Sequence, residues 1–259
     1  MHDFGMSKTP PAGLYSRREA IRFVAGAAAA VFVGCRRERQ GPWEPRAGGI
    51  SRATALAADL PACVVRPAQT EGPYFVDEKL QRSDIRSDPG DGALKQGVPL
   101  RLSFHVSRID GRSCSPLSDA IVDVWHCDAL GVYSDVRDPS FDTRGKKFLR
   151  GYQTTNAGGV AEFLTIYPGW YSGRAVHIHF KVRTHPSSQR GDEFTSQIYF
   201  DESVTDKVHA QSPYNRKGHR TTTNDRDFIF REGGKKLLPV LTEDSDGYKA
   251  RFDIGLQLT

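Results

Sequence analysis

The sequence predicts an all-β fold, a β-sandwich of mixed short strands with long loops and only a few short helices. Several segments alternate apolar and polar residues, which is typical of strands that bury one face. The 259 residues include 25 glycines and 15 prolines, many of them between the alternating segments. Only residues 203–211 have a helical pattern. Short strands separated by glycine and proline favour a sandwich over a fold of alternating strands and helices.

The strands are predicted from the period-two pattern along the chain. The longest runs are residues 98–106 and 248–258, where every second residue is apolar. A turn at residues 109–112 joins the first run to a further strand. Shorter strands are predicted at residues 120–127, 159–166, 176–183 and 195–200. All-β domains of about 200 residues are common as single units, so we expect one folded domain at residues 59–259.

The N-terminal residues 1–35 are typical of an export signal. The sequence Ser-Arg-Arg-Glu-Ala-Ile at residues 16–21 resembles the twin-arginine motif, with Ala20 where Phe is usual. The apolar run that follows, residues 23–34, is too short to span a bilayer and suits a signal peptide. It ends at Cys35 in a pattern that resembles a lipobox, so either Cys35 is lipidated or an ordinary peptidase cleaves nearby. Residues 36–58 are predicted to be a flexible linker.

This organisation predicts an exported protein, periplasmic or otherwise extracytoplasmic, attached to the membrane if Cys35 carries lipid. The signal contributes part of the net charge of +5. The remaining positive charge is weak and dispersed, with no basic stripe interleaved with aromatic residues, which excludes a nucleic-acid footprint. The sequence does not indicate an oligomeric state.

The chain has four cysteines, which fits an oxidising compartment. If Cys35 carries lipid, three remain and one pair can form. Cys114 and Cys127 flank a predicted strand and are too far apart to bridge. We therefore prefer a Cys63–Cys127 pair, with three free buried thiols as the alternative.

The predicted strand at residues 176–183 carries the first chemical signal. His177 and His179 share one face of it with Lys181. Alone, this pair suits a cupin metal site, a zinc site or two surface histidines equally well. A cupin would need a carboxylate shortly after the second histidine, but Asp192 and Glu193 lie too far along the chain. A structural zinc site would normally recruit cysteine, and the sequence has no Cys-x-x-Cys.

Two tyrosines near the histidines point to a different metal. The turn at Pro168 and Gly169 delivers Tyr171 beside the histidine strand, and Tyr133 follows the predicted strand at residues 120–127. Two phenolates with two imidazoles make a hard, anionic set, which favours a trivalent ion such as ferric iron. Either tyrosine could instead be a packing aromatic at a strand end or a turn.

Five segments in the same order resemble the intradiol ring-cleavage dioxygenases, the family of protocatechuate 3,4-dioxygenase and catechol 1,2-dioxygenase. The short connection between Tyr171 and His177 departs from the better-known enzymes and implies a more open site. The export signal resembles the exported subgroup of the family. The matching segments are residues 70–75, 120–133, 150–151 with 165–171, 174–180, and 196–200.

The resemblance implies a mononuclear non-haem Fe(III) that cleaves catechol-type rings with O2 between the two hydroxylated carbons, giving muconate-type diacids. Tyr171 would leave the iron when the catechol binds and act as a base. Arg174 and Gln197 would stabilise the charge that develops on the substrate, although an ion pair and a hydrogen-bond network would explain them as well. The implied iron ligands are Tyr133, Tyr171, His177 and His179.

One alternative function stays open: a non-catalytic exported β-sandwich that binds catechols, siderophores or carbohydrate. The presence of Arg174 and Gln197 beside all four ligands favours the enzyme, because a binding module would not need both. His126 has no ligand role in the resemblance and is assigned to the core or to the surroundings of the ligands. Catechol, protocatechuate, hydroxyquinol and substituted catechols all remain candidate substrates.

Overall fold

The computed structural model describes residues 64–186 and 191–258, which belong to one compact unit. The predicted signal (residues 1–35) and linker (residues 36–58) lie outside the described residues. Among the described residues, the helices are all too short or too polar to cross a membrane.

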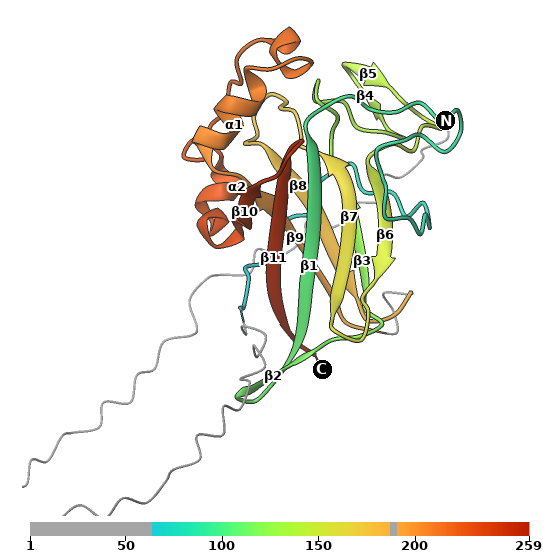
Figure 1. Ribbon diagram of the computed structural model, residues 1–259, viewed down its shortest axis with the longest axis vertical. Coiled ribbons are helices and arrows are strands. Elements are labelled where there is room, and N and C mark those ends of the chain that lie inside the picture. Colours follow the sequence, from blue (N-terminus) through green and yellow to red (C-terminus); the bar gives the residue numbers. More distant parts are fainter. Residues whose placement is uncertain (1–63, 187–190, 259) are drawn as a thin grey trace, which may run out of the picture. The chain divides into compact units, whose positions relative to one another are not determined.

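The first sheet is built around the long strand β1. Strand β11 pairs with β1 in parallel, with Tyr248 opposite Leu100. On the other side of β1, β7 and β2 pair antiparallel, and β10 pairs with the outer edge of β11 (Figure 1). The strands are β1 (Pro99–Asp110), β2 (Ser113–Pro116), β7 (Val160–Ile166), β10 (Val240–Glu243) and β11 (Tyr248–Gln257).

The second sheet has the order β6-β3-β8-β9, with every neighbouring pair antiparallel. Its strands are β3 (Ile121–Trp125), β6 (Arg150–Thr154), β8 (His177–Arg183) and β9 (Glu193–Tyr199). A small ribbon of β4 (Arg137–Asp138) and β5 (Phe141–Asp142) stands apart from both sheets. The predicted strands thus correspond to observed strands.

The two sheets pack face to face around an aromatic core. Phe180 of β8 contacts Phe104 of β1 and Phe252 of β11, with ring centroids 5.1 and 5.2 Å apart. All three side chains are fully buried. Each contributes roughly 1.5–3 kcal/mol through its transfer from water. The sandwich predicted from the alternating pattern is therefore confirmed.

The helices gather beside one edge of the sandwich (Figure 1). Helix α1 (Glu202–His209) is the predicted one, and Asp201 caps it by accepting from the Ser203 N–H at 2.9 Å. The sequence pattern did not predict helix α2 (Phe228–Arg231) or the 3-10 turns η1 (Tyr214–Lys217) and η2 (Gly234–Leu237). Each has four residues, too few for a helical period to be visible.

Strand β8 is more deeply buried than its alternating sequence suggests, because all seven of its residues are buried. The apolar face lies in the core, and residues 69–78, which we call the covering segment, lie against the polar face. Lys181, for example, forms an ion pair with Glu71 of this segment at 2.5 Å. The histidines of β8 therefore lie inside the protein and not on its surface.

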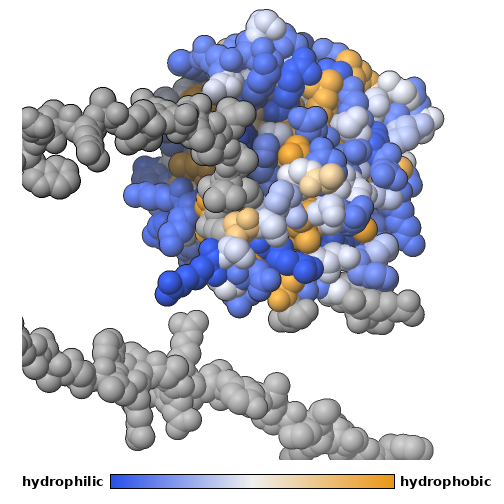
Figure 2. All heavy atoms as spheres, turned by 60° about the horizontal axis from the view of Figure 1, so that its bottom comes forward, coloured by the Kyte–Doolittle hydropathy of each residue, from blue (hydrophilic) through white to orange (hydrophobic). Residues whose placement is uncertain are grey.

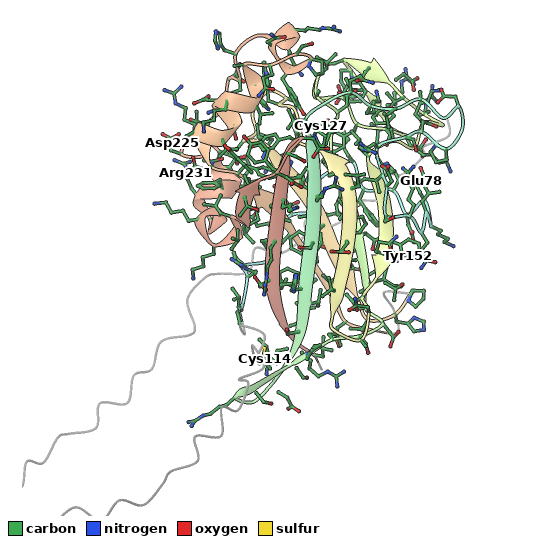
Figure 3. The ribbon with its side chains drawn as sticks, viewed as in Figure 1. Glu78, Cys114, Cys127, Tyr152, Asp225 and Arg231 are labelled. Carbon is green, nitrogen blue, oxygen red and sulfur yellow. The ribbon has the colours of Figure 1, made fainter. Side chains whose placement is uncertain are left out.

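The preferred cysteine pairing is wrong. Cys127 is a free, buried thiol whose Sγ contacts the Gly169 carbonyl at 3.5 Å, so it cannot pair with Cys63. Cys114 of β2 is disulfide-bonded. Figure 3 shows Cys114 and Cys127 at opposite ends of the sandwich, which confirms that these two cannot bridge.

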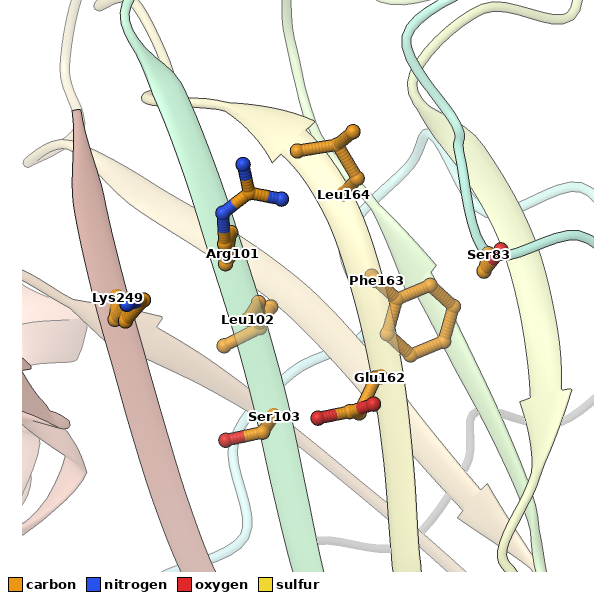
Figure 4. Close-up of a pocket in the computed structure, with 8 residues that line it drawn as sticks. All are labelled: Ser83, Arg101, Leu102, Ser103, Glu162, Phe163, Leu164 and Lys249. Carbon is orange, nitrogen blue, oxygen red and sulfur yellow. The ribbon is translucent and has the colours of Figure 1, made fainter. Parts of the chain in front are cut away.

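The surface gives little sign of a large apolar patch on the face turned forward in Figure 2, where apolar side chains are scattered among hydrophilic ones. A pocket lies on the first sheet (Figure 4). Arg101, Ser103 and Glu162 line it and alternate in sequence with the core residues Leu102 and Phe163, so it opens on the outer face of the sheet. None of the four candidate ligands lines this pocket.

Candidate metal centre

The two histidines of β8 aim their Nε2 atoms at one point. The Nε2 atoms of His177 and His179 lie 3.0 Å apart, and the Tyr171 hydroxyl is 3.1 Å from His177 Nε2. The Nδ1 atom of His177 lies 2.6 Å from the Ala175 carbonyl oxygen. A carbonyl can only accept, so Nδ1 carries the proton and His177 Nε2 presents a lone pair to the centre.

His179 is held by packing. The Trp125 ring stacks on the His179 ring with centroids 5.1 Å apart and an interplanar angle of 7°. Gly72 of the covering segment lies against the ring edge, since a Cβ there would be 3.2 Å from His179 Cε1. The Nδ1 atom of His179 is buried and has no hydrogen-bond partner among the described residues. The two histidines therefore point their Nε2 atoms at the same place, but a hydrogen bond orients His177 whereas packing orients His179.

Tyr133 reaches the centre from the loop after β3. Its side chain is fully buried, and its hydroxyl has no hydrogen-bond partner among the described residues. Its ring stacks on Tyr74 with centroids 4.4 Å apart and meets Tyr171 edge-on at 5.8 Å. A buried hydroxyl without a partner is costly in a folded protein, which makes this group a candidate for metal coordination.

The two tyrosine loops interlock through glycine. Gly131 has a φ of +82°, and a Cβ at this position would overlap the Trp170 carbonyl. A Cβ at Gly169 would likewise overlap the Ala129 carbonyl. The Gly169 N–H donates to the Asp128 carbonyl at 3.2 Å. Only glycine permits this close backbone approach, so the loops that carry Tyr133 and Tyr171 fold as one unit.

Burial keeps all four candidate ligands neutral in the metal-free protein. It lowers the pKa of the His177 imidazole to about 3, with Arg174 as a further cause, and lowers the pKa of His179 well below its usual value. It raises the pKa of the Tyr133 and Tyr171 phenols. At neutral pH the imidazoles are therefore ready to bind a cation, whereas the phenols need the cation itself to become ionised.

Arg174 and Gln197 lie beside this centre and contact each other. Arg174 Nη2 donates to Gln197 Oε1 at 2.5 Å and to the Tyr199 hydroxyl at 3.2 Å. Gln197 Nε2 donates to the Thr70 carbonyl at 2.9 Å, which ties it to the covering segment. The structure thus brings together all six residues that the sequence analysis selected.

Known proteins resemble this chain in sequence and in fold. A family model described as Dioxygenase matches residues 70–174. The chain is 30% identical to an intradiol ring-cleavage dioxygenase of Tetranychus urticae, with a TM-score of 0.64 over 75% of this chain and 95% of that one. The chain belongs to the intradiol ring-cleavage dioxygenase family.

Other intradiol dioxygenases are similar over shorter stretches or with looser superposition. The dioxygenase domain of a dioxygenase carbohydrate-binding fusion from Streptomyces sp. SirexAA-E is 28% identical, with a TM-score of 0.53 over 75% of this chain and 99% of that one. Catechol 1,2-dioxygenase 1 of Acinetobacter lwoffii is 27% identical over 207 residues, 70% of this chain and 55% of the relative. The chain spans about half the length of the curated relatives it matches.

Sequence reasoning missed Asp227, which holds Arg174 in place. The fully buried Asp227 carboxylate accepts from Arg174 Nε at 2.9 Å and from the Ala175 N–H at 2.8 Å. Burial opposes its ionisation, but these donors outweigh that effect and lower the pKa of Asp227. Asp227 also caps α2, and an Asp before the apolar residues 228–230 is a recognisable helix start. No pattern in the sequence around Asp227 indicates its contact with Arg174, which lies 53 residues earlier.

His126 is a core residue of the dioxygenase domain, as one of the two sequence assignments had it. It is buried, with Nδ1 2.8 Å from the Cys127 carbonyl and Nε2 2.6 Å from Thr165 Oγ1. It thus joins the end of β3 to β7. Within residues 64–186 and 191–258, no group of three or more His, Cys, Asp or Glu side chains forms a second metal cluster.

Proposed function

We propose that this protein is a ferric-iron dioxygenase that cleaves catechol-type rings between their two hydroxylated carbons. The observation that carries the proposal is that His179 Nε2 and the Tyr171 hydroxyl both lie within about one hydrogen-bond length of His177 Nε2. The unpartnered hydroxyl of Tyr133 supplies the fourth donor. These are the residues that would hold the iron.

The donor set fits a trivalent ion better than zinc. Two neutral imidazoles and two phenolates would leave a ferric site with one net positive charge, which suits the binding of a dianionic catechol. Hard oxygen donors favour such an ion over softer metals. The free thiol of Cys127 lies close by but contacts the Gly169 carbonyl, so it is engaged elsewhere.

The protein's own residues have separate roles in this reaction. When bound, ferric iron supplies the Lewis acidity that favours the catechol dianion and the redox chemistry that lets O2 add to the ring. Tyr171 Oη is placed to take a proton from a substrate hydroxyl, since it lies within hydrogen-bond range of the ligand cluster. Asp227 and the Thr70 carbonyl already hold Arg174 and Gln197 beside the centre, so the two side chains are placed to stabilise developing negative charge without rearrangement.

The relatives support a catechol as the substrate class. Their names include catechol 1,2-dioxygenase, chlorocatechol 1,2-dioxygenase and the beta chain of protocatechuate 3,4-dioxygenase. A screen of catechol, chlorocatechols, protocatechuate and hydroxyquinol would identify the ring substituent that the protein prefers.

Colour and turnover test the proposal together. We expect protein loaded with Fe(III) to show a visible tyrosinate charge-transfer band and to convert catechol and O2 into a product with muconate absorbance. The variant Tyr171→Phe should shift the band and impair turnover. A colourless protein that takes up zinc instead of iron would refute the proposal. A coloured protein that binds catechol without cleaving it would be the non-catalytic binding module.

The proposal includes export by the twin-arginine route, because that route carries folded proteins and would let iron be loaded before the protein crosses the membrane. The support is the motif at Arg17 and Arg18 followed by a short apolar run. Replacement of both arginines by lysine should abolish export. Undiminished export of that variant would contradict the route. Labelling with a radioactive fatty acid, in wild type and in Cys35→Ser, would test the lipid anchor.

A further inference from the structure

Lys181 continues the face of β8 that carries the two histidines, and its ammonium group is almost fully enclosed. The side chain is 7% exposed. Its Nζ lies 2.5 Å from Glu71 Oε2 and 2.6 Å from Glu193 Oε1, and 4.4 Å from the centre of the Phe75 ring. Glu71 and Phe75 belong to the covering segment, whereas Glu193 is the first residue of β9.

The ligand next to Lys181 on this face, His179, lacks the support that metal-binding histidines usually have. Such histidines almost always donate their second ring N–H to a carboxylate, a carbonyl or water. His177 does so through the Ala175 carbonyl, but the buried Nδ1 of His179 has no partner in the described part of the chain. Its ring is held by Trp125 on one face and by Gly72 at the edge.

Lys181 is connected to each of the two supports, Gly72 and Trp125, by one intermediate residue. Glu71, its ion-pair partner, directly precedes Gly72. Phe75, which lies under its ammonium group, packs on Trp125 with ring centroids 4.8 Å apart. The contacts therefore form two routes from Lys181 to His179, one on each support of the ligand ring.

We propose that Lys181 and Glu71 are positioning residues that clamp the covering segment over β8 and thereby orient His179 toward the metal. The inference rests on the proposed function, because it assigns the clamp to an iron ligand. The enclosed Lys181 ammonium group makes this contact sensitive, since loss of Glu71 leaves a poorly solvated cation with only one of its two carboxylate partners.

The chain offers a matched control at the same ammonium group. Glu193 makes an ion pair of nearly the same length with Lys181. It lies on β9, however, and is not adjacent to Gly72 in sequence as Glu71 is. The variants Glu71→Gln and Glu193→Gln therefore each remove one carboxylate charge from Lys181. Only the first also removes a contact that holds the covering segment against β8.

Two readouts test the clamp. In metal-free protein, amide hydrogen exchange should become faster across residues 70–76 in Glu71→Gln and stay as in wild type in Glu193→Gln. In Fe(III)-loaded protein, Glu71→Gln should shift the visible band and release iron to a chelator about tenfold faster, the size typical for loss of a group that supports a metal ligand. Glu193→Gln should do neither. Melting temperatures show that each variant is folded, and Glu71→Asp replaces Glu71→Gln if the latter does not fold.

The outcomes separate the clamp from the proposed function. Equal effects of the two variants, or none from either, on both readouts would overturn the clamp. Wild-type protein that shows no ferric band would refute the proposed function, and hydrogen exchange in the metal-free protein would still decide whether Glu71 holds the covering segment. Selective opening in Glu71→Gln with an unchanged iron site would refute the link from the segment to His179.

Discussion

The two histidines and the two tyrosines of the candidate metal centre are placed by different means. His177 and His179 lie on a central strand, where hydrogen-bonded neighbours set their register: His179 is opposite Trp125 of β3 and Gln197 of β9. Tyr133 and Tyr171 lie on loops, which are placed by backbone contacts between the loops themselves. The candidate ligands on the strand are thus positioned by the sheet. Those on the loops are positioned by the close backbone approach that glycine permits.

This difference indicates which substitutions should disturb the candidate metal centre most. The backbone of a strand with neighbours on both sides tolerates the loss of one side-chain contact, because its ladder of hydrogen bonds remains. Interlocked loops have no ladder and depend on a few close approaches. The following predictions test that contrast, beginning with the joint between the two regions.

The largest effect is expected at Asp227, which holds Arg174 and Ala175 between the Tyr171 loop and the histidine strand. Asp227→Asn keeps an acceptor for the α2 cap but removes the counterion of a mostly buried guanidinium. We expect a loss of roughly 3 kcal/mol in the free energy of unfolding. In the iron-loaded enzyme kcat should fall more than KM changes, because Arg174 would no longer be aimed at the reacting group.

Asp225→Asn is the matched control, since Asp225 is an exposed carboxylate two residues away (Figure 3). It should leave both unfolding in urea and turnover as in wild type. Wild-type stability in Asp227→Asn would mean that Arg174 finds its position without a counterion.

Gly131→Ala should separate the tyrosine loops. The added methyl group would overlap the Trp170 carbonyl, at a residue that also has a positive φ. Overpacking and backbone strain together predict a loss of about 3 kcal/mol and a weaker ferric band. Gly111 also has a positive φ, +58°, but open space around it, so Gly111→Ala shows the effect of backbone strain without overpacking. If both variants melt alike, the loops do not depend on their close approach.

Acidic pH should lower the free energy of unfolding through His126, which lies at the end of β3. Burial lowers its pKa to about 4 from the usual 6.5, so the unfolded chain binds a proton over this range before the folded protein does. The stabilisation is complete above pH 6.5 and is lost as the pH falls to 4, by about 3 kcal/mol in total. The variant His126→Gln should lose less stability than wild type between these two pH values, measured by urea unfolding of metal-free protein. Parallel curves would refute this role.

A smaller effect is expected at Lys217, which touches both tyrosine loops. Its Nζ donates to the Leu130 carbonyl at 2.6 Å and lies 4.8 Å from the centre of the Trp170 ring. Lys217→Met should cost about 1 kcal/mol, the sum of one modest hydrogen bond and one cation–π contact. Lys207→Met, which removes an exposed ion pair at 3.6 Å, should cost less than can be measured. Equal melting of the two variants would show that Lys217 does not join the loops.

Much of the fold was predictable because strand patterns are local. The period of two in residues 98–106 and 248–258 marked β1 and β11, and His177 with His179 marked the polar face of β8. The order of the motifs placed all six site residues. These features depend on neighbours within a few positions, which a sequence displays directly.

The rest depends on contacts between distant segments. The burial of β8 on both faces requires the covering segment, about 100 residues earlier in the chain, which no strand pattern encodes. The ion pair of Asp227 with Arg174 spans 53 residues. The preference for a Cys63–Cys127 bridge failed for the same reason, since spacing does not show that Cys127 lies under the Tyr171 loop.

The parallel pairing of β1 with β11 has a consequence for biosynthesis. The central strand of the first sheet finds its partner on one edge, β11, only roughly 150 residues later in the sequence. A ribosome must therefore synthesise roughly 150 further residues after β1 before this sheet can close, and until then one edge of β1 is bare. Premature termination that removes β11 (Tyr248–Gln257) should leave a nascent chain that chaperones hold and proteases remove.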